Sequence, residues 1–128
     1  MELDMANDPN DLWPEFEEVP LMTPVAILKE QGAFLSKRTS GLLDVEITSS
    51  TDFDEFLHNF NIIARTLDYS YRLFKIKHEI TLYPVNLYWG DKWHEASNEE
   101  QFRKLLADIL SHESTRKILL ALLAQSRS

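Results

Sequence analysis

The chain has 128 residues, 44% of them hydrophobic, a net charge of −8 and no cysteine. This length and composition are typical of one domain that buries a real hydrophobic core, and the lack of cysteine excludes disulfides. The longest apolar run, residues 118–124, is far shorter than the roughly 20 residues that span a bilayer, and the N-terminal residues lack the basic and apolar regions of a signal peptide. We therefore expect a cytoplasmic protein without a membrane contact.

The negative charge is concentrated near the N-terminus. Residues 1–28 contain seven of the 21 acidic side chains and none of the 13 basic ones, so the rest of the chain is nearly neutral. A general nucleic-acid binder needs a basic surface that displaces counterions from phosphates, and we expect no direct nucleic-acid contact. We divide the chain into an acidic N-terminal arm, residues 1–22, which should be partly disordered, and a single α+β domain, residues 23–128.

The second half of the arm combines aromatic and acidic side chains. Trp13 and Phe16 lie close to Glu17 and Glu18, and the prolines in this segment disfavour a regular helix. In one interpretation the two rings pack on the core of the domain itself. In the other the segment is a docking peptide for a basic protein partner, in which the rings are anchors and the carboxylates steer the encounter.

A helix followed by a strand is predicted for residues 23–48. Thr23 can cap the free amides of a helix whose first residue is Pro24, and the helix should end at Gly41. Gly32 in its middle costs about 1 kcal/mol relative to alanine, unless close packing requires it. The alternation of apolar and polar residues over 43–48 predicts a strand with one exposed side.

Residues 55–67 fit both a helical stripe and one face of a strand. We favour the strand because a tight turn at residues 67–69 would place Phe60 opposite Ile76 and bring two apolar faces together. In that register His58 lies opposite His78. A helix here would leave a domain with one strand fewer.

Residues 69–96 are the densest run of β-branched and aromatic residues and should form the centre of the sheet. Because this run is too long for one strand, we expect it to break near Glu79 or to bend at Pro84. Ser97 and Glu100 form a capping box that starts an amphipathic helix, and a second helix should follow over residues 115–125. The predicted fold is an α+β antiparallel β-meander of four or five strands, with one N-terminal and two C-terminal helices packed on one face.

The last helix is apolar nearly all round, which permits two interpretations. It can be buried between the sheet and a neighbouring element, or it can form a homodimer or partner face. The candidate oligomer face consists of Leu119, Leu120 and Leu123.

The histidines are the first candidates for chemistry. The spacings of His58, His78, His94 and His112 match no local metal motif, so no metal site is assigned. A cross-strand pair of His58 and His78, with His94 at the same rim of the sheet, could still line a pocket for a ligand or a metal. The alternative is that these rings hydrogen-bond to backbone groups. No glycine-rich phosphate loop or nucleophile elbow is present, and we expect no cofactor.

Trp89 and Trp93 flank a turn at residues 90–91 and should project at one end of the sheet, either as an exposed binding surface or as a small core closed by the arm. The expected function is a non-catalytic protein-binding or regulatory module. A concrete version is an acidic inhibitor or immunity-type protein whose arm engages a basic cleft, as of a nuclease. The competing class is a small enzyme or ligand binder that uses the histidine pocket at the sheet rim.

Overall fold

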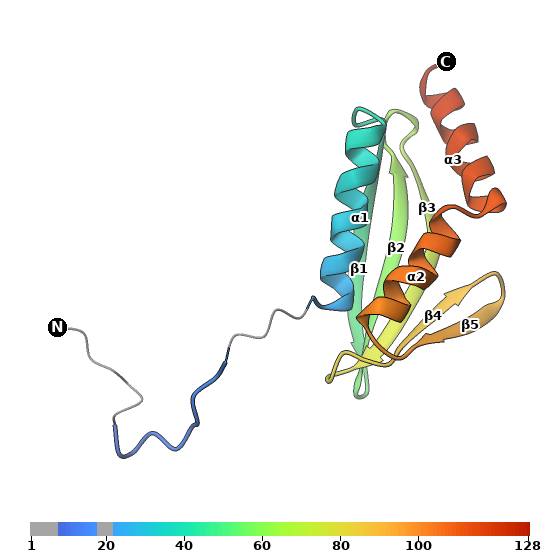
Figure 1. The fold of residues 1–128 in the computed structure, drawn as a ribbon. Helices are drawn as coiled ribbons and strands as arrows, with labels where there is room; N and C mark the ends of the chain where they lie inside the picture. The colour runs from blue at the N-terminus through green and yellow to red at the C-terminus, as the bar shows by residue number, and fades with distance from the viewer. Residues whose placement is uncertain (1–7, 18–21) are drawn as a thin grey trace.

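The protein is built around one five-stranded antiparallel sheet in the spatial order β1-β2-β3-β4-β5, with three helices, in a computed structural model that describes residues 8–17 and 22–128 (Figure 1). The predicted α+β meander is confirmed, and most of the ambiguous segment 55–67 is strand. No helix in these described ranges is long and apolar enough to cross a membrane. The elements are α1 (Pro24–Arg38), β1 (Leu43–Asp52), β2 (Glu55–Ala64), the short 3-10 helix η2 (Arg65–Leu67), β3 (Tyr69–Glu79), β4 (Val85–Trp89), β5 (Lys92–Ala96), α2 (Glu99–Leu110) and α3 (Glu113–Ser126).

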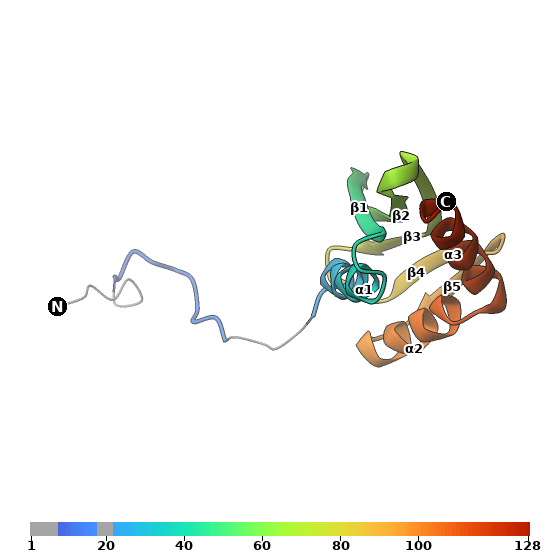
Figure 2. The same cartoon turned by 90° about the horizontal axis from the view of Figure 1, so that it is seen from above.

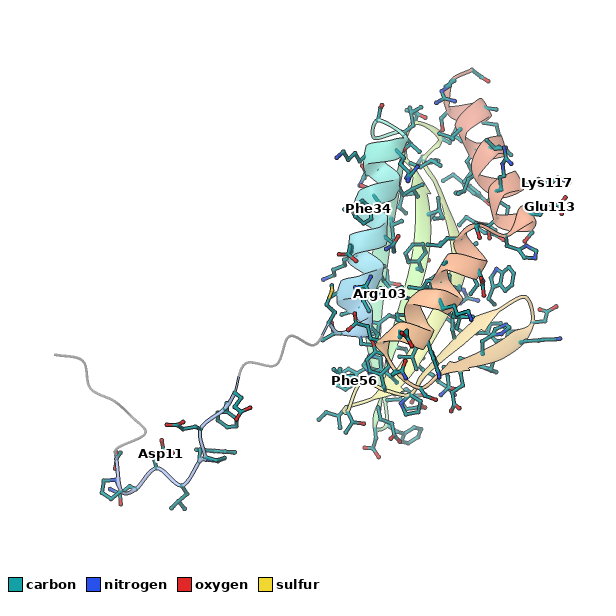
Figure 3. All side chains as sticks on the ribbon, viewed as in Figure 1. Asp11, Phe34, Phe56, Arg103, Glu113 and Lys117 are labelled. Atoms are coloured by element: carbon teal, nitrogen blue, oxygen red, sulfur yellow. The ribbon has the colours of Figure 1, made fainter. Side chains whose placement is uncertain are left out.

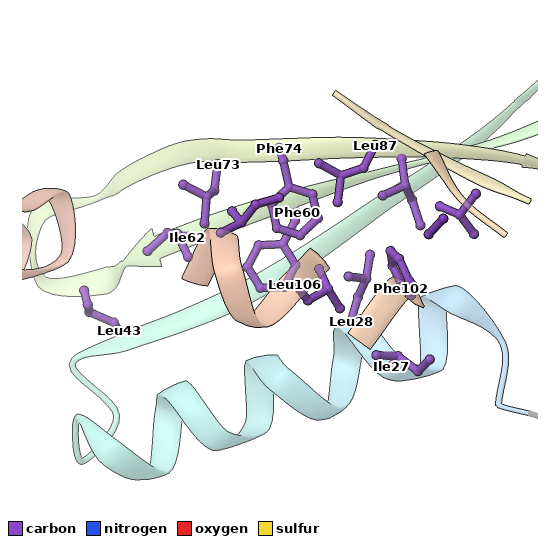
Figure 4. Close-up of a cluster of buried hydrophobic side chains, with 14 of the residues drawn as sticks. Ile27, Leu28, Leu43, Phe60, Ile62, Leu73, Phe74, Leu87, Phe102 and Leu106 are labelled. Carbon is purple, nitrogen blue, oxygen red and sulfur yellow. The ribbon is translucent and has the colours of Figure 1, made fainter. Parts of the chain in front are cut away.

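All three helices contribute buried side chains to one core on a single face of the sheet (Figures 2 and 4). The alternation along β2 defines that face, because Phe60, Ile62 and Ala64 are buried while the residues between them are half-exposed. The opposite face is left without a helix in the part of the chain that the structure describes. The helices supply Ile27 and Leu28 from α1, Phe102, Leu106 and Ile109 from α2, and Leu122 from α3.

The pairing of β2 with β3 differs from the predicted register. Phe60 lies opposite Phe74 rather than Ile76, and His58 lies opposite Ile76 rather than His78. The reason is the connection: the chain turns through η2 and a left-handed Asp68, which is a longer path than the tight turn we assumed. A bulge after Phe60 then shifts the register again.

The helix starts follow their sequence signals, with one shift of position. The hydroxyl of Thr23 accepts a hydrogen bond from the amide of Ala26 at 3.2 Å, as expected for the first helix. In α2 the cap is Asn98 rather than Ser97. The Asn98 side chain accepts from the amide of Gln101 at 2.9 Å, and the Gln101 side chain accepts from the amide of Ser97 at 2.8 Å. The reciprocal pair that satisfies free amides is therefore present one residue further along the chain.

Gly32 lies where α1 packs closely on β1. A methyl group built on this residue would lie 2.8 Å from Cβ of Val45, a distance that real side chains essentially never show. Because Cβ of Val45 is fixed to the strand backbone, the helix itself would have to move. Close packing thus explains a glycine in the middle of a helix.

The variant Gly32→Ala tests this explanation, since helix propensity and packing predict opposite signs. Alanine favours the helix by about 1 kcal/mol, whereas overpacking a tight contact costs about 1–3 kcal/mol. We expect a net loss in the free energy of unfolding measured by urea denaturation. Lys37→Ala, at an exposed position of the same helix, is the control and should stay within about 0.5 kcal/mol of the native protein. An unchanged or increased stability of Gly32→Ala would contradict the packing argument.

Candidate functional site

The described part of the arm, residues 8–17, contains neither helix nor strand and exposes its aromatic side chains. Trp13 is 76% exposed and Phe16 is 78% exposed, and their ring centroids lie 6.1 Å apart. Figure 3 shows this segment, marked by Asp11, well away from the helices and the sheet. The structure therefore shows the two rings in solvent rather than on the core. Glu17 is described with them, and Glu18 lies outside the described residues.

The arm joins the domain at a fixed point between α1 and α2. The Tyr83 hydroxyl donates to the carbonyl of Met22 at 3.4 Å, and the Arg103 guanidinium lies 3.1 Å from the sulfur of Met22. Arg103 also pairs with Glu99 at 3.0 Å and with Glu30 at 3.2 Å, which joins the two helices (Figure 3). These hydrogen bonds raise the pKa of Arg103, and burial raises the pKa of Tyr83.

Trp89 and Trp93 lie at one end of the sheet, but on opposite faces. Tyr88 is the cross-strand partner of Trp93, and cross-strand partners share a face of the sheet. Since Tyr88 and Trp89 are consecutive, Trp89 points to the opposite face from both. Trp89 faces the helices. Its ring centroid lies 4.9 Å from that of His112, with the two rings edge-on, and 6.3 Å from that of His94. Trp93 faces away from the helices and is 46% exposed. The two tryptophans therefore do not form one surface.

The open face of the sheet carries a basic and aromatic cluster that the sequence interpretation did not single out. Lys75 lies with its ammonium group 5.3 Å from the ring centroid of Tyr88 and 5.8 Å from that of Trp93, and Lys77 lies 4.5 Å from Trp93. The rings of Tyr88 and Trp93 are 5.1 Å apart. These distances are those of cation–π contacts. We call Lys75, Lys77, Tyr88 and Trp93 the open-face cluster.

The neighbouring strands of the open face are polar. The Asn59 amide donates to the Thr48 hydroxyl at 3.1 Å, and the Asn61 amide donates to the Glu46 carbonyl at 3.1 Å. Arg72 lies opposite Asn61 and is exposed. The open face thus carries amides on β2, cations on β3 and aromatic rings on β4 and β5, with the exposed carboxylate of Glu95 beside Trp93 on β5.

The structure brings His58 and His78 together but places His94 elsewhere. His58 and His78 are not direct cross-strand partners, but their rings stack with centroids 5.3 Å apart. The ring of Phe56 also stacks on His78, with centroids 5.6 Å apart. Nδ1 of His58 is 2.7 Å from the Ser49 hydroxyl. Both imidazoles are almost buried, with exposed fractions of 7% and 5%. Within the described residues, no group of three potential ligands is arranged to hold a metal ion.

The electrostatic setting of His58 follows from this burial. Desolvation, followed by repulsion from His78 and Lys29, lowers the pKa of His58 below its ordinary value of 6.5. Nδ1 of His78 is 2.7 Å from the carbonyl of Glu79. Each of the two rings thus has a hydrogen-bond partner at Nδ1, and the folded state favours the neutral form of His58.

A cavity of ≈ 490 Å³ opens between the three helices, away from the histidines. Its floor is the sheet, and Phe34 of α1 forms part of its wall (Figure 3). The predicted oligomer face is split at this cavity. Leu119 lines it, Leu123 is half-buried against the core, and Leu120 is 52% exposed. The full lining is Gln31, Phe34, Leu35, Arg38, Phe60, Ile62, Leu73, Ala107, Leu110, Ser111 and Leu119.

Comparison with protein-family models, curated proteins and solved structures finds no match for this chain. The candidate site is therefore defined by the chain's own side chains. These are exposed rings and carboxylates on the arm, and ammonium groups over aromatic rings on the open face. Exposed rings and charged groups are accessible to other molecules, whereas two stacked, nearly buried imidazoles offer little access to a ligand.

The lowered pKa of His58 has a direct consequence for stability. The unfolded chain binds a proton on this ring more readily than the folded protein does, so the contribution of the neutral ring is complete above about pH 6.5 and is lost as the pH falls through the lowered folded-state pKa. We expect His58→Gln to reduce the decline in the free energy of unfolding between about pH 7 and about pH 5. Urea denaturation at both pH values measures it. Asn59→Gln on the same strand is the control, and a full decline in His58→Gln would contradict the assignment.

Proposed function

We propose that this protein is a non-catalytic protein-binding module whose N-terminal arm docks on a basic surface of a protein partner. The exposure of Trp13 and Phe16 is the observation that carries this proposal. Two large rings kept in water are costly, and burying each against a partner contributes about 1.5–3 kcal/mol. Aromatic residues that become buried at the centre of an interface are also the usual hot spots.

The charge of the arm determines which partner it fits. Asp8, Asp11, Glu15 and Glu17 are close to the two aromatic residues in the sequence, whereas residues 29–128 are nearly neutral. The arm therefore dominates the electrostatic field that an approaching molecule meets, and it attracts a positively charged surface. A basic cleft, such as that of an enzyme acting on a polyanion, fits this chemistry. An inhibitor or immunity-type role is the concrete form of the proposal.

The competing proposal is a ligand or metal pocket at His58, His78 and His94. It has less support, because His94 lies beside Trp89 and away from the other two. The cavity between the helices has none of these histidines in its lining.

We also assign the protein to the cytoplasm, since a chain without cysteine gains nothing from an oxidising compartment.

The test is a quantitative pull-down from the native host with the full-length protein, followed by affinity measurement on the purified partner. We expect the double variant Trp13→Ala/Phe16→Ala to raise the Kd about tenfold or more, because it removes both anchors. The matched control is Phe53→Ala. Phe53 is a 98% exposed aromatic residue at the β1–β2 turn and is not part of the arm. Partner retention that is equal for the native protein and the double variant would overturn the proposal.

A further inference from the structure

The open-face cluster has the chemistry that the arm requires of a partner. Lys75 and Lys77 are two residues apart on β3, so both point to the same face with a spacing of about 6.6 Å along the strand. Tyr88 and Trp93 lie beside them, at the cation–π distances given above. Among the residues that the structure describes, no carboxylate lies within ion-pair distance of either ammonium group. The cluster is thus a compact basic and aromatic patch. Glu95 lies on the same face of β5, opposite Asn86, which is the cross-strand neighbour of Lys77.

The arm carries a complementary sequence pattern. Glu15 and Glu17 are also two residues apart, so their carboxylates would lie on one side about 6.6 Å from each other once the arm is extended. Trp13 falls on that side as well. An extended arm can therefore set two carboxylates against two ammonium groups and place an indole ring next to the aromatic pair. In the structure the ring centroids of Trp13 and Phe16 lie 6.1 Å apart, so docking in this form requires the segment to straighten.

We propose that the arm of one copy docks on the open-face cluster of a second copy, with Glu15 and Glu17 against Lys75 and Lys77. This inference rests on the proposed function, in which the arm is the contact element. The occupant is assigned from charge and spacing. Partly desolvated ion pairs and ring contacts would form together, so the cluster and the arm each cover the other's exposed aromatic surface.

The root of the arm explains why a second copy is the occupant. Met22 is held on the helix-covered side of the sheet by Tyr83 and Arg103. The open-face cluster lies on the other side, so the sheet separates the root of an arm from the cluster of its own chain. In Figures 1 and 2 residues 8–17 lie beyond the N-terminal end of α1 and away from the sheet. A neighbouring copy meets no such obstacle.

In the absence of a partner, the arm would be bound to the open-face cluster of a second copy. A partner with a more strongly basic surface would release it, because the partner and the cluster compete for the same carboxylates and rings of the arm. Self-association should weaken as salt screens the exposed charges.

Sedimentation equilibrium of the full-length protein measures the self-association. We expect association at low salt that weakens between about 0.05 M and about 0.5 M salt. Lys75→Glu/Lys77→Glu should raise the Kd about tenfold or more, and Glu15→Lys/Glu17→Lys should do the same, because each places like charges together. Circular dichroism verifies that both variants keep the native fold.

The decisive measurement is an equimolar mixture of these two variants. Each associates poorly with itself, but the acidic arm of the first meets the unchanged lysines of the second, while the basic arm of the second meets the new carboxylates of the first. We expect the mixture to regain association. Leu120→Glu is the control for the alternative interface on α3 and should associate like the native protein.

Several outcomes overturn the inference. These are a strictly monomeric native protein, a mixture that stays monomeric, and loss of association in Leu120→Glu. Binding of a single-stranded oligonucleotide that is lost in Lys75→Glu/Lys77→Glu would assign the cluster to nucleic acid instead. The proposed function fails separately: a partner whose capture needs Trp13 and Phe16 supports it even when self-association is absent.

Discussion

The register between β2 and β3 is the constraint on which the rest of the structure depends. The rings of Phe60 and Phe74 stack across these strands at 4.6 Å and only 8° from parallel, in the middle of the core (Figure 4). The bulge next to Phe60 lets both Leu73 and Phe74 face the helices. From Phe74 onward the alternation then directs His78 inward and Lys75 and Lys77 outward. One stacked pair and one extra residue thus decide what each face of the sheet presents.

Much of the fold could be predicted from local patterns. Thr23 and Pro24 start α1 where expected, the alternation in residues 55–64 is a strand, and the apolar stripes after residue 98 are helices. The β2–β3 register could not be predicted in the same way. It depends on a 3-10 turn that ends in a left-handed Asp68, and a short stretch of sequence does not specify such a turn uniquely.

The candidate site shows the same division between local and tertiary information. The acidity of the arm and its two rings are visible in the sequence, and the interpretation of exposed anchors needs only that they find no place on the core. Part of the open-face cluster is predictable as well: Lys75 and Lys77 alternate with buried residues, so the sequence indicates that both lysines point away from the core. What the sequence does not show is that Tyr88 comes to lie opposite Lys75, because that pairing is set by the connection from Glu79 to Val85. The proximity of His58 and His78 was anticipated, although through a different pairing.

Arg103 gives the molecule a mechanical property. Its guanidinium connects α1 through Glu30, α2 through Glu99 and the root of the arm through Met22. A pulling force that reaches Met22 would therefore act on both helices at once, at the place where they meet. Arg103 is the side chain that would distribute this force between them.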